Sequence, residues 1–298
     1  MKRFSIFVLV FLFILHSFCI AECIDLTSMS TDELIILRNQ INDELIERSK
    51  TEETNPTEGL IYVSNGIEVH IKGYTGSEKD VVIPEKIDGV PVVSIDDHAF
   101  EKNKNINSVK LPSSLTYIGN NAFYCCTSLK YIYFPREPID TLMIGYLAFD
   151  STALTGIIVV NVKNLTVDWH AFKDCGSRID TASSFVFLCD SVTFSQMPFY
   201  DSEIDYVYFK PNADVKFKYP DYAFGSSSVK AVYFPDNFDG FDENMFNGTN
   251  FAIVYGRDKD AVCIKEANNK FLLTNYSEYE VRTTQILNQV SEMGYSIQ

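Results

Sequence analysis

Apolar and polar side chains alternate in short segments that return along the central part of the chain. The clearest are residues 131–134, 206–209 and 231–234. Alternation with a period of two predicts strands that bury one face. Pro135 and Pro235 close two of these segments, and proline marks strand ends because it has no N–H to donate. Similar segments occupy residues 108–111, 156–160 and 185–188.

A phenylalanine precedes each segment and marks a longer repeat. The string at residues 95–100, Ile-Asp-Asp-His-Ala-Phe, returns at residues 118–123, 144–149 and 167–172 with the same spacing. No single repeat can bury its own phenylalanine, so neighbouring repeats must stack and share one core. We therefore predict a ladder of seven rings, 22 to 27 residues apart in sequence: Phe100, Phe123, Phe149, Phe172, Phe199, Phe224 and Phe246.

A small or polar residue follows three positions after each phenylalanine and predicts a second ladder where the chain turns. Its members include Cys126 and Cys175, which are two repeats apart. Strands lie about 4.7–4.9 Å apart, so these two sulfurs would be separated by roughly 10 Å, too far for a disulfide. This favours buried free thiols at both positions, while the pairing of Cys189 and Cys263 stays open.

The unit at residues 111–129, LPSSLTYIGNNAFYCCTSL, resembles the BspA-like leucine-rich repeats of bacterial and some protist surface proteins. The resemblance covers roughly residues 60–275 and implies an α/β repeat solenoid with a parallel β-sheet on its concave face and an irregular convex side. It also implies adhesion or host interaction, without naming a ligand. Pro198 replaces the usual alanine in the fifth copy, which predicts an irregular turn there.

Both ends of the solenoid need a cap. Residues 59–74 alternate around Asn65-Gly66, which predicts a β-hairpin over the first repeat. Residues 258–268 have a helical composition and predict a helical cap at the other end. The repeat domain with its caps is therefore expected to span residues 58–275, and residues 276–298 to form a polar tail.

The first 21 residues have the pattern of a secretory signal. Lys2 and Arg3 precede an apolar run from residue 4 to 15, and Cys19-Ile20-Ala21 offers small side chains for cleavage between Ala21 and Glu22. An uncleaved anchor remains the alternative, because the run extends to residue 20. No later stretch is long and apolar enough to span a bilayer. We expect a secreted or cell-surface protein.

Residues 22–57 predict a short amphipathic helix and a linker. Leu34, Leu37, Ile41 and Leu45 form an apolar stripe, and the segment around Pro56 is polar. The stripe would pack on the following domain or, as the alternative, bind a partner.

Net charge and composition limit the classes of molecule that this protein can bind and the kind of fold that it can form. The formal charge is −15, from 25 basic and 40 acidic residues, which argues against binding nucleic acid or anionic lipid. The 46 % apolar content excludes wholesale disorder. Among aromatic residues, 23 Phe and 17 Tyr stand against a single Trp.

No motif for catalysis, metal or cofactor is present. His98 and His170 share one repeat position three units apart, too far for a common metal. The acidic run at residues 236–243 lacks the carboxylate spacing of a calcium loop. We expect no catalytic residue, no metal and no cofactor.

The best candidate is therefore a surface. In each strand, the residues between the buried ones should face the concave side, where tyrosine offers rigid contact area with a polar tip. The predicted protein or glycan partner would contact Tyr131, Tyr133, Ile158, Tyr206, Tyr208 and Tyr233. Stacking of these tyrosines without any ligand is the alternative for the surface. For the whole protein, the alternatives are an enzyme built on the repeats or a structural surface-layer component.

Overall fold

The computed structural model describes residues 57–176, 182–235, 237–249, 251–255, 261–265 and 276–296. The chain divides into two compact units, residues 1–53 and 54–298, and all of the described residues belong to the second. The predicted signal with its Ala21–Glu22 cleavage site, and the predicted helix and linker up to residue 56, lie outside the described residues.

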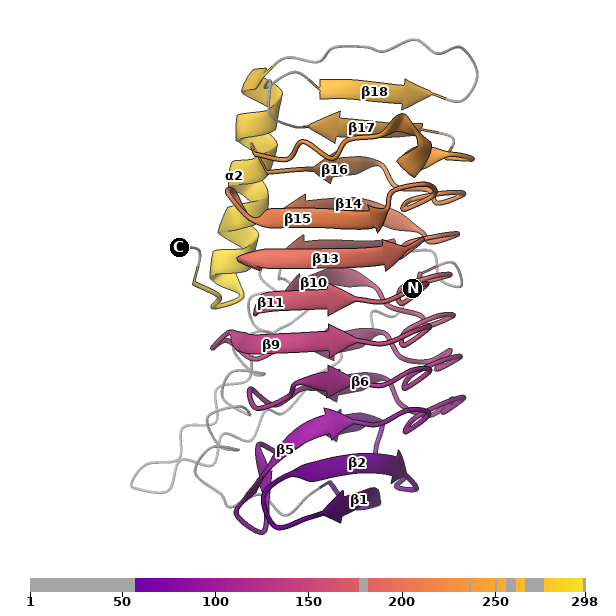
Figure 1. The fold of residues 1–298 in the computed structure, drawn as a ribbon, viewed down its shortest axis with the longest axis vertical. Coiled ribbons are helices and arrows are strands. Elements are labelled where there is room, and N and C mark those ends of the chain that lie inside the picture. The colour runs from indigo at the N-terminus through magenta and orange to yellow at the C-terminus, as the bar shows by residue number, and fades with distance from the viewer. Residues whose placement is uncertain are drawn as a thin grey trace, which may run out of the picture. The chain divides into compact units, whose positions relative to one another are not determined.

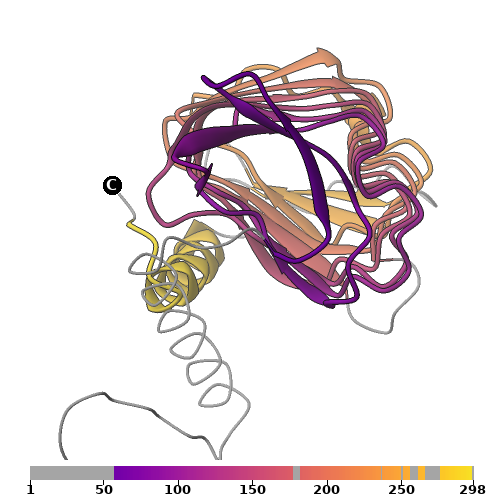
Figure 2. The ribbon, with the colours of Figure 1, turned by 90° about the horizontal axis from the view of Figure 1, so that it is seen from below.

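The second unit is a solenoid whose strands stack along one axis in two layers (Figures 1 and 2). One layer, the long sheet, runs in the order β1-β2-β5-β7-β9-β11-β13-β15, and β4 pairs with β5 at its side. Beyond β2 all neighbours in this order are parallel and one repeat apart. Its strands are β1 (Leu60–Ser64), β2 (Val69–Tyr74), β4 (Lys86–Ile87), β5 (Val90–Ile95), β7 (Tyr117–Ile118), β9 (Ile139–Ile144), β11 (Val162–Val167), β13 (Ser191–Gln196) and β15 (Asp214–Tyr219).

The other layer contains the strands that the alternation predicts. Three of them form a parallel sheet, β3 (Asp80–Val82), β6 (Ser108–Lys110) and β8 (Tyr131–Tyr133). A six-stranded sheet continues this layer with β10 (Gly156–Val160), β12 (Ser183–Phe187), β14 (Ile204–Phe209), β16 (Ala231–Tyr233), β17 (Phe251–Tyr255) and β18 (Ala261–Lys265). A 3₁₀-helix, η2 (Glu243–Phe246), closes the seventh phenylalanine turn, and the C-terminal helix α2 spans Tyr276–Glu292.

The expectation of an irregular convex side is wrong, because the long sheet occupies that side. Its strands alternate as well: β9 buries Leu142 and Ile144, and β11 buries Leu165 and Val167 at the matching positions. A neighbour one repeat away supplies a partner for each strand's backbone groups, so regular pairing satisfies more hydrogen bonds than an irregular chain would.

The predicted phenylalanine ladder fills the space between the layers. Successive ring centroids are 5.0 to 5.6 Å apart, and their planes lie within 14° of parallel. All seven rings are buried, with at most 2 % of each residue exposed. The fifth copy keeps its place in the stack although Pro198 replaces alanine.

The second ladder satisfies backbone carbonyls at the turn. The Thr152 hydroxyl donates to the carbonyl of Phe149 at 2.8 Å, and the Ser202 hydroxyl donates to that of Phe172 at 2.7 Å. The Cys126 thiol donates to the carbonyl of Phe100 at 2.9 Å, and burial raises its pKa to about 12. Cys126 and Cys175 are free and buried, which confirms that prediction, and Cys189 is likewise free and buried.

The first six turns hold residues in the left-handed region two positions before and two positions after the phenylalanine. In the third turn these are Leu147 and Ser151, with φ of 53° and 59°. Such a conformation costs a non-glycine residue about 1–2 kcal/mol. The two left-handed residues bend the chain tightly around the phenylalanine ring. Neighbouring side chains are left on the outside of the turn.

Reversed strands occupy both ends. At the N-terminal end β1 and β2 pair antiparallel around Asn65-Gly66, where the sequence predicts a turn, and β2 pairs with β5. At the other end β18 pairs antiparallel with β17, so the predicted helical cap is wrong for Ala261–Lys265. This segment contains Val262 and Ile264, whose branched side chains favour strands, and pairing gives the edge of β17 a partner.

Candidate binding surface

The outer side of β8, β10, β12, β14 and β16, here called the tyrosine face, carries the predicted ligand-binding residues. On β14, Val207 and Phe209 join the interior core while Tyr206 and Tyr208 point outward. On β16, Val232 is interior and Tyr233 is outward. The alternation therefore predicts the facing of the tyrosines in these strands.

Ile158 is the exception, and its assignment to this surface is wrong. Its side chain lies in the interior core, whereas Ile157 and Val159 face outward. Ile158 pairs with Phe185, which in turn pairs with the interior Val207. Every residue of β10 after Gly156 is apolar, so the strand has no alternation from which its facing can be predicted.

Helix α2 packs along the tyrosine face, as Figures 1 and 2 show. Ile286 and Val290 are 5 % and 0 % exposed and form one apolar cluster with Tyr208 and Tyr233 of the sheet. The cluster also contains Val159, Val186, Leu188 and Ala231, with Ile157, Tyr206, Leu287, Met293 and Tyr295 at its margin. The segment expected to be a polar tail is thus an amphipathic helix with a docking surface.

This helix overturns the ligand-binding assignment for two tyrosines. Tyr208 and Tyr233 are 1 % and 2 % exposed, because α2 covers rings that would otherwise lie on the surface. Tyr206 is half-buried at the margin, and burial raises its pKa to about 12. Tyr131 and Tyr133, on β8, are also half-buried and stack with centroids 6.3 Å apart and planes 17° from parallel.

The C-terminal residues extend this cover toward β8. The hydroxyl of Tyr295 donates to the carbonyl of Phe134 at 2.9 Å, and Phe134 directly follows β8. Residues 161 positions apart are thereby joined, and the helix is held at both the sheet face and its own C-terminal end.

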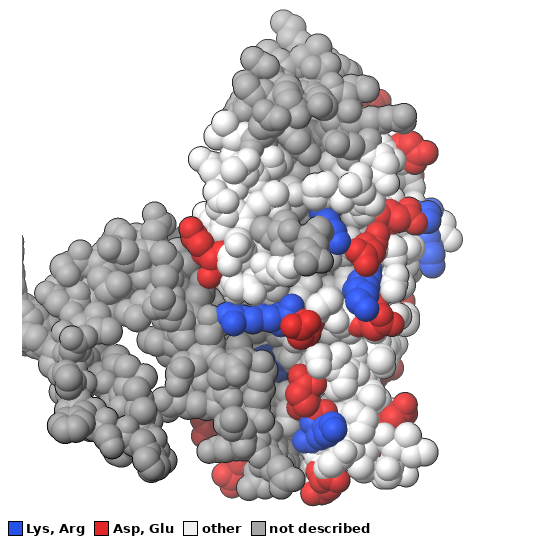
Figure 3. Space-filling model, turned by 90° about the vertical axis from the view of Figure 1, so that its left-hand side faces the viewer, with Lys and Arg blue, Asp and Glu red and all other residues white. Residues whose placement is uncertain are grey.

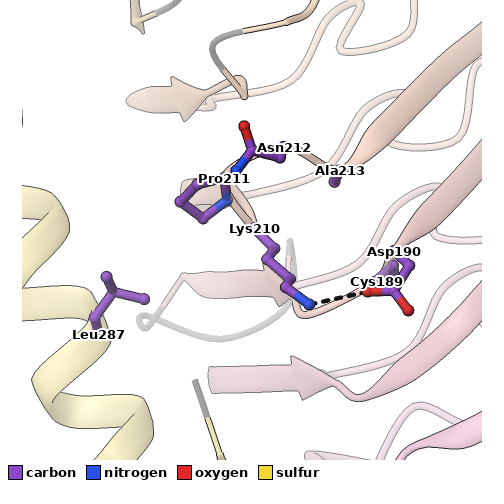
Figure 4. Close-up of a pocket in the computed structure, with 7 residues that line it drawn as sticks. All are labelled: Cys189, Asp190, Lys210, Pro211, Asn212, Ala213 and Leu287. Atoms are coloured by element: carbon purple, nitrogen blue, oxygen red, sulfur yellow. Dashed lines mark hydrogen bonds and ion pairs between the residues drawn. The ribbon is translucent and has the colours of Figure 1, made fainter. Parts of the chain in front are cut away.

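A cavity of about 320 Å³ lies where α2 meets the connection between β14 and β15 (Figure 4). Leu287 of the helix faces Lys210 and Pro211 across it, and Lys210 pairs with Asp190 at 2.9 Å. Burial raises the pKa of the Cys189 thiol, which keeps it protonated and unreactive. The cavity therefore has a paired cation and a neutral thiol in its lining.

Charges on the α2 side are mixed. Figure 3 shows acidic and basic side chains interspersed over the described part of this side. Two ion pairs join neighbouring repeats: Lys163 with Asp140 at 3.0 Å, and Lys210 with Asp190 at 2.9 Å. A surface of mixed charge gives little long-range steering to a charged molecule.

Histidine, serine and aspartate side chains meet on the outer side of the long sheet, but in an order that does not activate the serine. The Ser94 hydroxyl lies 2.7 Å from Nδ1 of His70 and donates to Asp96, which also pairs with Lys72. In a hydrolytic triad the histidine lies between acid and nucleophile. Here the hydroxyl lies between the other two, and Ser94 is only 4 % exposed.

The described residues contain no group of three or more His, Cys, Asp and Glu side chains that could hold a metal ion. His98 bonds to Glu101 at 2.7 Å and His170 packs on Trp169, so the two histidines act separately. Among the same residues, no helix is long and apolar enough to cross a bilayer.

Comparison with known proteins finds one family. The model of the BspA type leucine rich repeat region matches in six copies, over residues 77–179 and 144–259. A leucine rich repeat protein of T. pallidum, TpLRR, is 22 % identical over 69 % of this chain and 82 % of its own, with a TM-score of 0.48. A leucine rich cell surface protein of Faecalibacterium prausnitzii is 22 % identical over 75 % of this chain and 61 % of its own, with a TM-score of 0.44. No curated protein matches the sequence.

Proposed function

Because this chain belongs to the BspA-type leucine-rich repeat family, we propose that it is an exported, non-enzymatic recognition protein. Its partner is a protein or glycan at the cell surface or in the extracellular matrix, and its role is adhesion. The predicted export signal supports a location outside the cell. The net charge of −15 argues against nucleic acid and anionic lipid as partners. The order of His70, Ser94 and Asp96, which differs from that of a hydrolytic triad, supports a non-enzymatic role.

The contact on the tyrosine face is made by Tyr131 and Tyr133, with Tyr206 at its margin. The observation that carries this assignment is the stacking of the first two rings on one strand, with both residues partly exposed. Rings held in place lose little conformational freedom on binding, and each adds a hydroxyl that can donate or accept a hydrogen bond.

A binding screen with extracellular-matrix proteins and glycans, followed by variants, tests the assignment. We expect Tyr131→Ser combined with Tyr133→Ser to weaken binding of the captured partner at least tenfold. The matched control is Tyr219→Ser, which changes a 61 % exposed tyrosine on the long sheet and should bind normally. If the double variant keeps its thermal stability and its affinity, the tyrosine pair is not the contact.

A further inference from the structure

Aromatic side chains line the outside of four successive phenylalanine turns, those that follow β9, β11, β13 and β15 at the right of Figure 1. Tyr146, Trp169 and Tyr222 are 37 %, 43 % and 39 % exposed, and a contiguous exposed aromatic patch, unlike a single exposed ring, is typical of an interaction site. His170 and Tyr200 are half-buried between them. These five residues are called the aromatic ridge below.

The ridge is continuous. Tyr146 contacts Trp169 with centroids 6.0 Å apart, and Trp169 contacts His170 at 5.1 Å. His170 lies 6.2 Å from Tyr200, which lies 6.5 Å from Tyr222. The rings thus follow one another along the solenoid axis, in a row that is long and narrow.

The turn geometry holds the rings in place before any ligand binds. His170 and Tyr222 are left-handed residues, with φ of 57° and 59°. The backbone N–H of Tyr146 donates to the Asn120 side chain at 2.8 Å. Nε2 of His170 lies 3.3 Å from the sulfur of Met197, on the next turn. A ligand would therefore meet a largely ordered surface, which lowers the entropy cost of binding.

The charges beside the ridge disfavour a polyanionic ligand. Asp201 and Asp221 are exposed on the same turns, and the cation of Lys173 is paired with Asp150 at 3.4 Å. Burial, with help from nearby Lys173, lowers the pKa of His170, so the ridge itself is uncharged at neutral pH. Single-stranded nucleic acid also stacks on aromatic rows, but it needs a basic groove.

The shape of the ridge favours a polymer over a folded protein. Protein hot spots cluster at the centre of a patch and are ringed by contacts that exclude water. The ridge instead repeats one kind of contact at every step along an axis. A sugar ring presents a face of C–H groups that packs on an aromatic ring, and a linear polysaccharide repeats that face at regular intervals.

We propose that the aromatic ridge binds a linear, neutral polysaccharide lying along the solenoid axis. The site is separate from the tyrosine face, so this proposal stands or fails independently of the contact assigned to Tyr131 and Tyr133. It gives the protein a second recognition surface with a defined ligand chemistry.

Trp169 supplies the test, because it is the only tryptophan of the chain and lies on the ridge. Full-length protein is titrated with hydroxyethylcellulose, glucomannan and pullulan, and with polygalacturonate as the acidic comparison. We expect a saturable change in tryptophan emission with at least one neutral polymer and none with polygalacturonate. No change with any neutral polymer, or a response to polygalacturonate alone, would overturn the proposal.

Affinity electrophoresis in gels containing the same polymers locates the site. Trp169→Ala and Tyr222→Ala should each weaken retardation at least tenfold, and Trp169→Phe should keep most of it because the ring remains. Phe241→Ala is the control, because it removes a 42 % exposed ring that is not part of the ridge, and it should be retarded like the parent. Full retardation of the folded Tyr222→Ala and Trp169→Ala variants would show that the ridge is not the site.

Discussion

Both the phenylalanine ladder and the tyrosine face carry aromatic rings from successive repeats, but they are covered in different ways. Each of the five inner ladder rings has the equivalent rings of the turns before and after it as neighbours. On the tyrosine face, Tyr208 and Tyr233 are buried by Ile286 and Val290, from a helix outside the repeats. The repeat alone is sufficient to bury the interior, whereas the outer side depends on a segment that the repeat does not contain.

This difference separates two kinds of stability in one molecule. Removing a ladder ring breaks contacts on both sides, so the damage spreads to two neighbouring turns. Removing helix α2 exposes Tyr208 and Tyr233, but it leaves the phenylalanine ladder and the pairing of the strands unchanged. Substitutions in the ladder, under the helix and at the turns can tell the two kinds apart, and their expected effects decrease in that order.

A cavity in the ladder should give the largest loss. Phe149→Ala removes a fully buried ring between Phe123 and Phe172, so we expect a loss of about 3–5 kcal/mol in the free energy of unfolding. Urea denaturation followed by circular dichroism measures it. Phe241→Ala changes a 42 % exposed ring and should cost less than about 1 kcal/mol. Equal losses in the two variants would contradict the ladder's role.

A charge under the helix should detach α2 and spare the solenoid. Val290 is fully buried against the tyrosine face, and an unpaired carboxylate cannot stay there. In Val290→Asp we expect amides of residues 276–296 to lose protection in hydrogen exchange, while strands β9 to β14 keep theirs. Val281→Asp is the matched control, because Val281 is 57 % exposed on the same helix. Retained protection of the helix in Val290→Asp would show that docking does not depend on this contact.

Two tyrosines should respond differently to that detachment. The pKa of both Tyr206 and Tyr117 is raised to about 12 from an ordinary 10.0. Burial is the main cause at both, and at Tyr117 a hydrogen bond to Asp97 adds to it. Since the folded state favours the neutral phenol, each contributes stability that is complete below pH 10 and is lost as the pH rises through 12.

In Val290→Asp, the pKa of Tyr206 should fall toward 10 while that of Tyr117 stays near 12, because Tyr117 lies on the long sheet. Spectrophotometric titration of tyrosinate measures both values, and Tyr206→Phe and Tyr117→Phe assign them. A parallel fall of the two pKa values would mean that the variant loosens the whole solenoid.

Relief of backbone strain should give the smallest effect. Leu147 is left-handed, with φ of 53°, a conformation that glycine adopts without strain. We expect Leu147→Gly to be about 1 kcal/mol more stable than Leu147→Ala, which loses the same side chain but keeps the strain. Thermal unfolding of the two variants gives the difference. A more stable alanine variant would contradict the strain argument.

The ladder could be predicted because the information is repeated seven times in the sequence. A spacing of 22 to 27 residues and an alternating strand fix which ring is inside, and one irregular copy at Pro198 does not obscure it. The facing of Tyr206 and Tyr208 follows from the same alternation. Ile158 could not be assigned because its strand is apolar throughout.

The packing of helix α2 on the tyrosine face could not be predicted from the repeats. A signal for it exists: Thr283, Ile286, Val290 and Met293 recur at spacings of three and four, which is typical of an amphipathic helix. The segment is otherwise polar, which explains why it resembles a tail. Periodicity indicates that such a helix has an apolar side, but the surface it packs on is a tertiary contact that local pattern does not contain.

The reversed strands at the two ends decide how copies of this molecule can meet. A stack of parallel strands would offer the same edge at each end, on which further copies could add in register and grow into a fibril. Because β1 and β18 run against their neighbours, a second copy stacked in the same orientation cannot continue the parallel pairing at these two strands. The two hairpins therefore end the parallel repeat, one at the N-terminal edge of the long sheet and the other at the C-terminal edge of the six-stranded sheet.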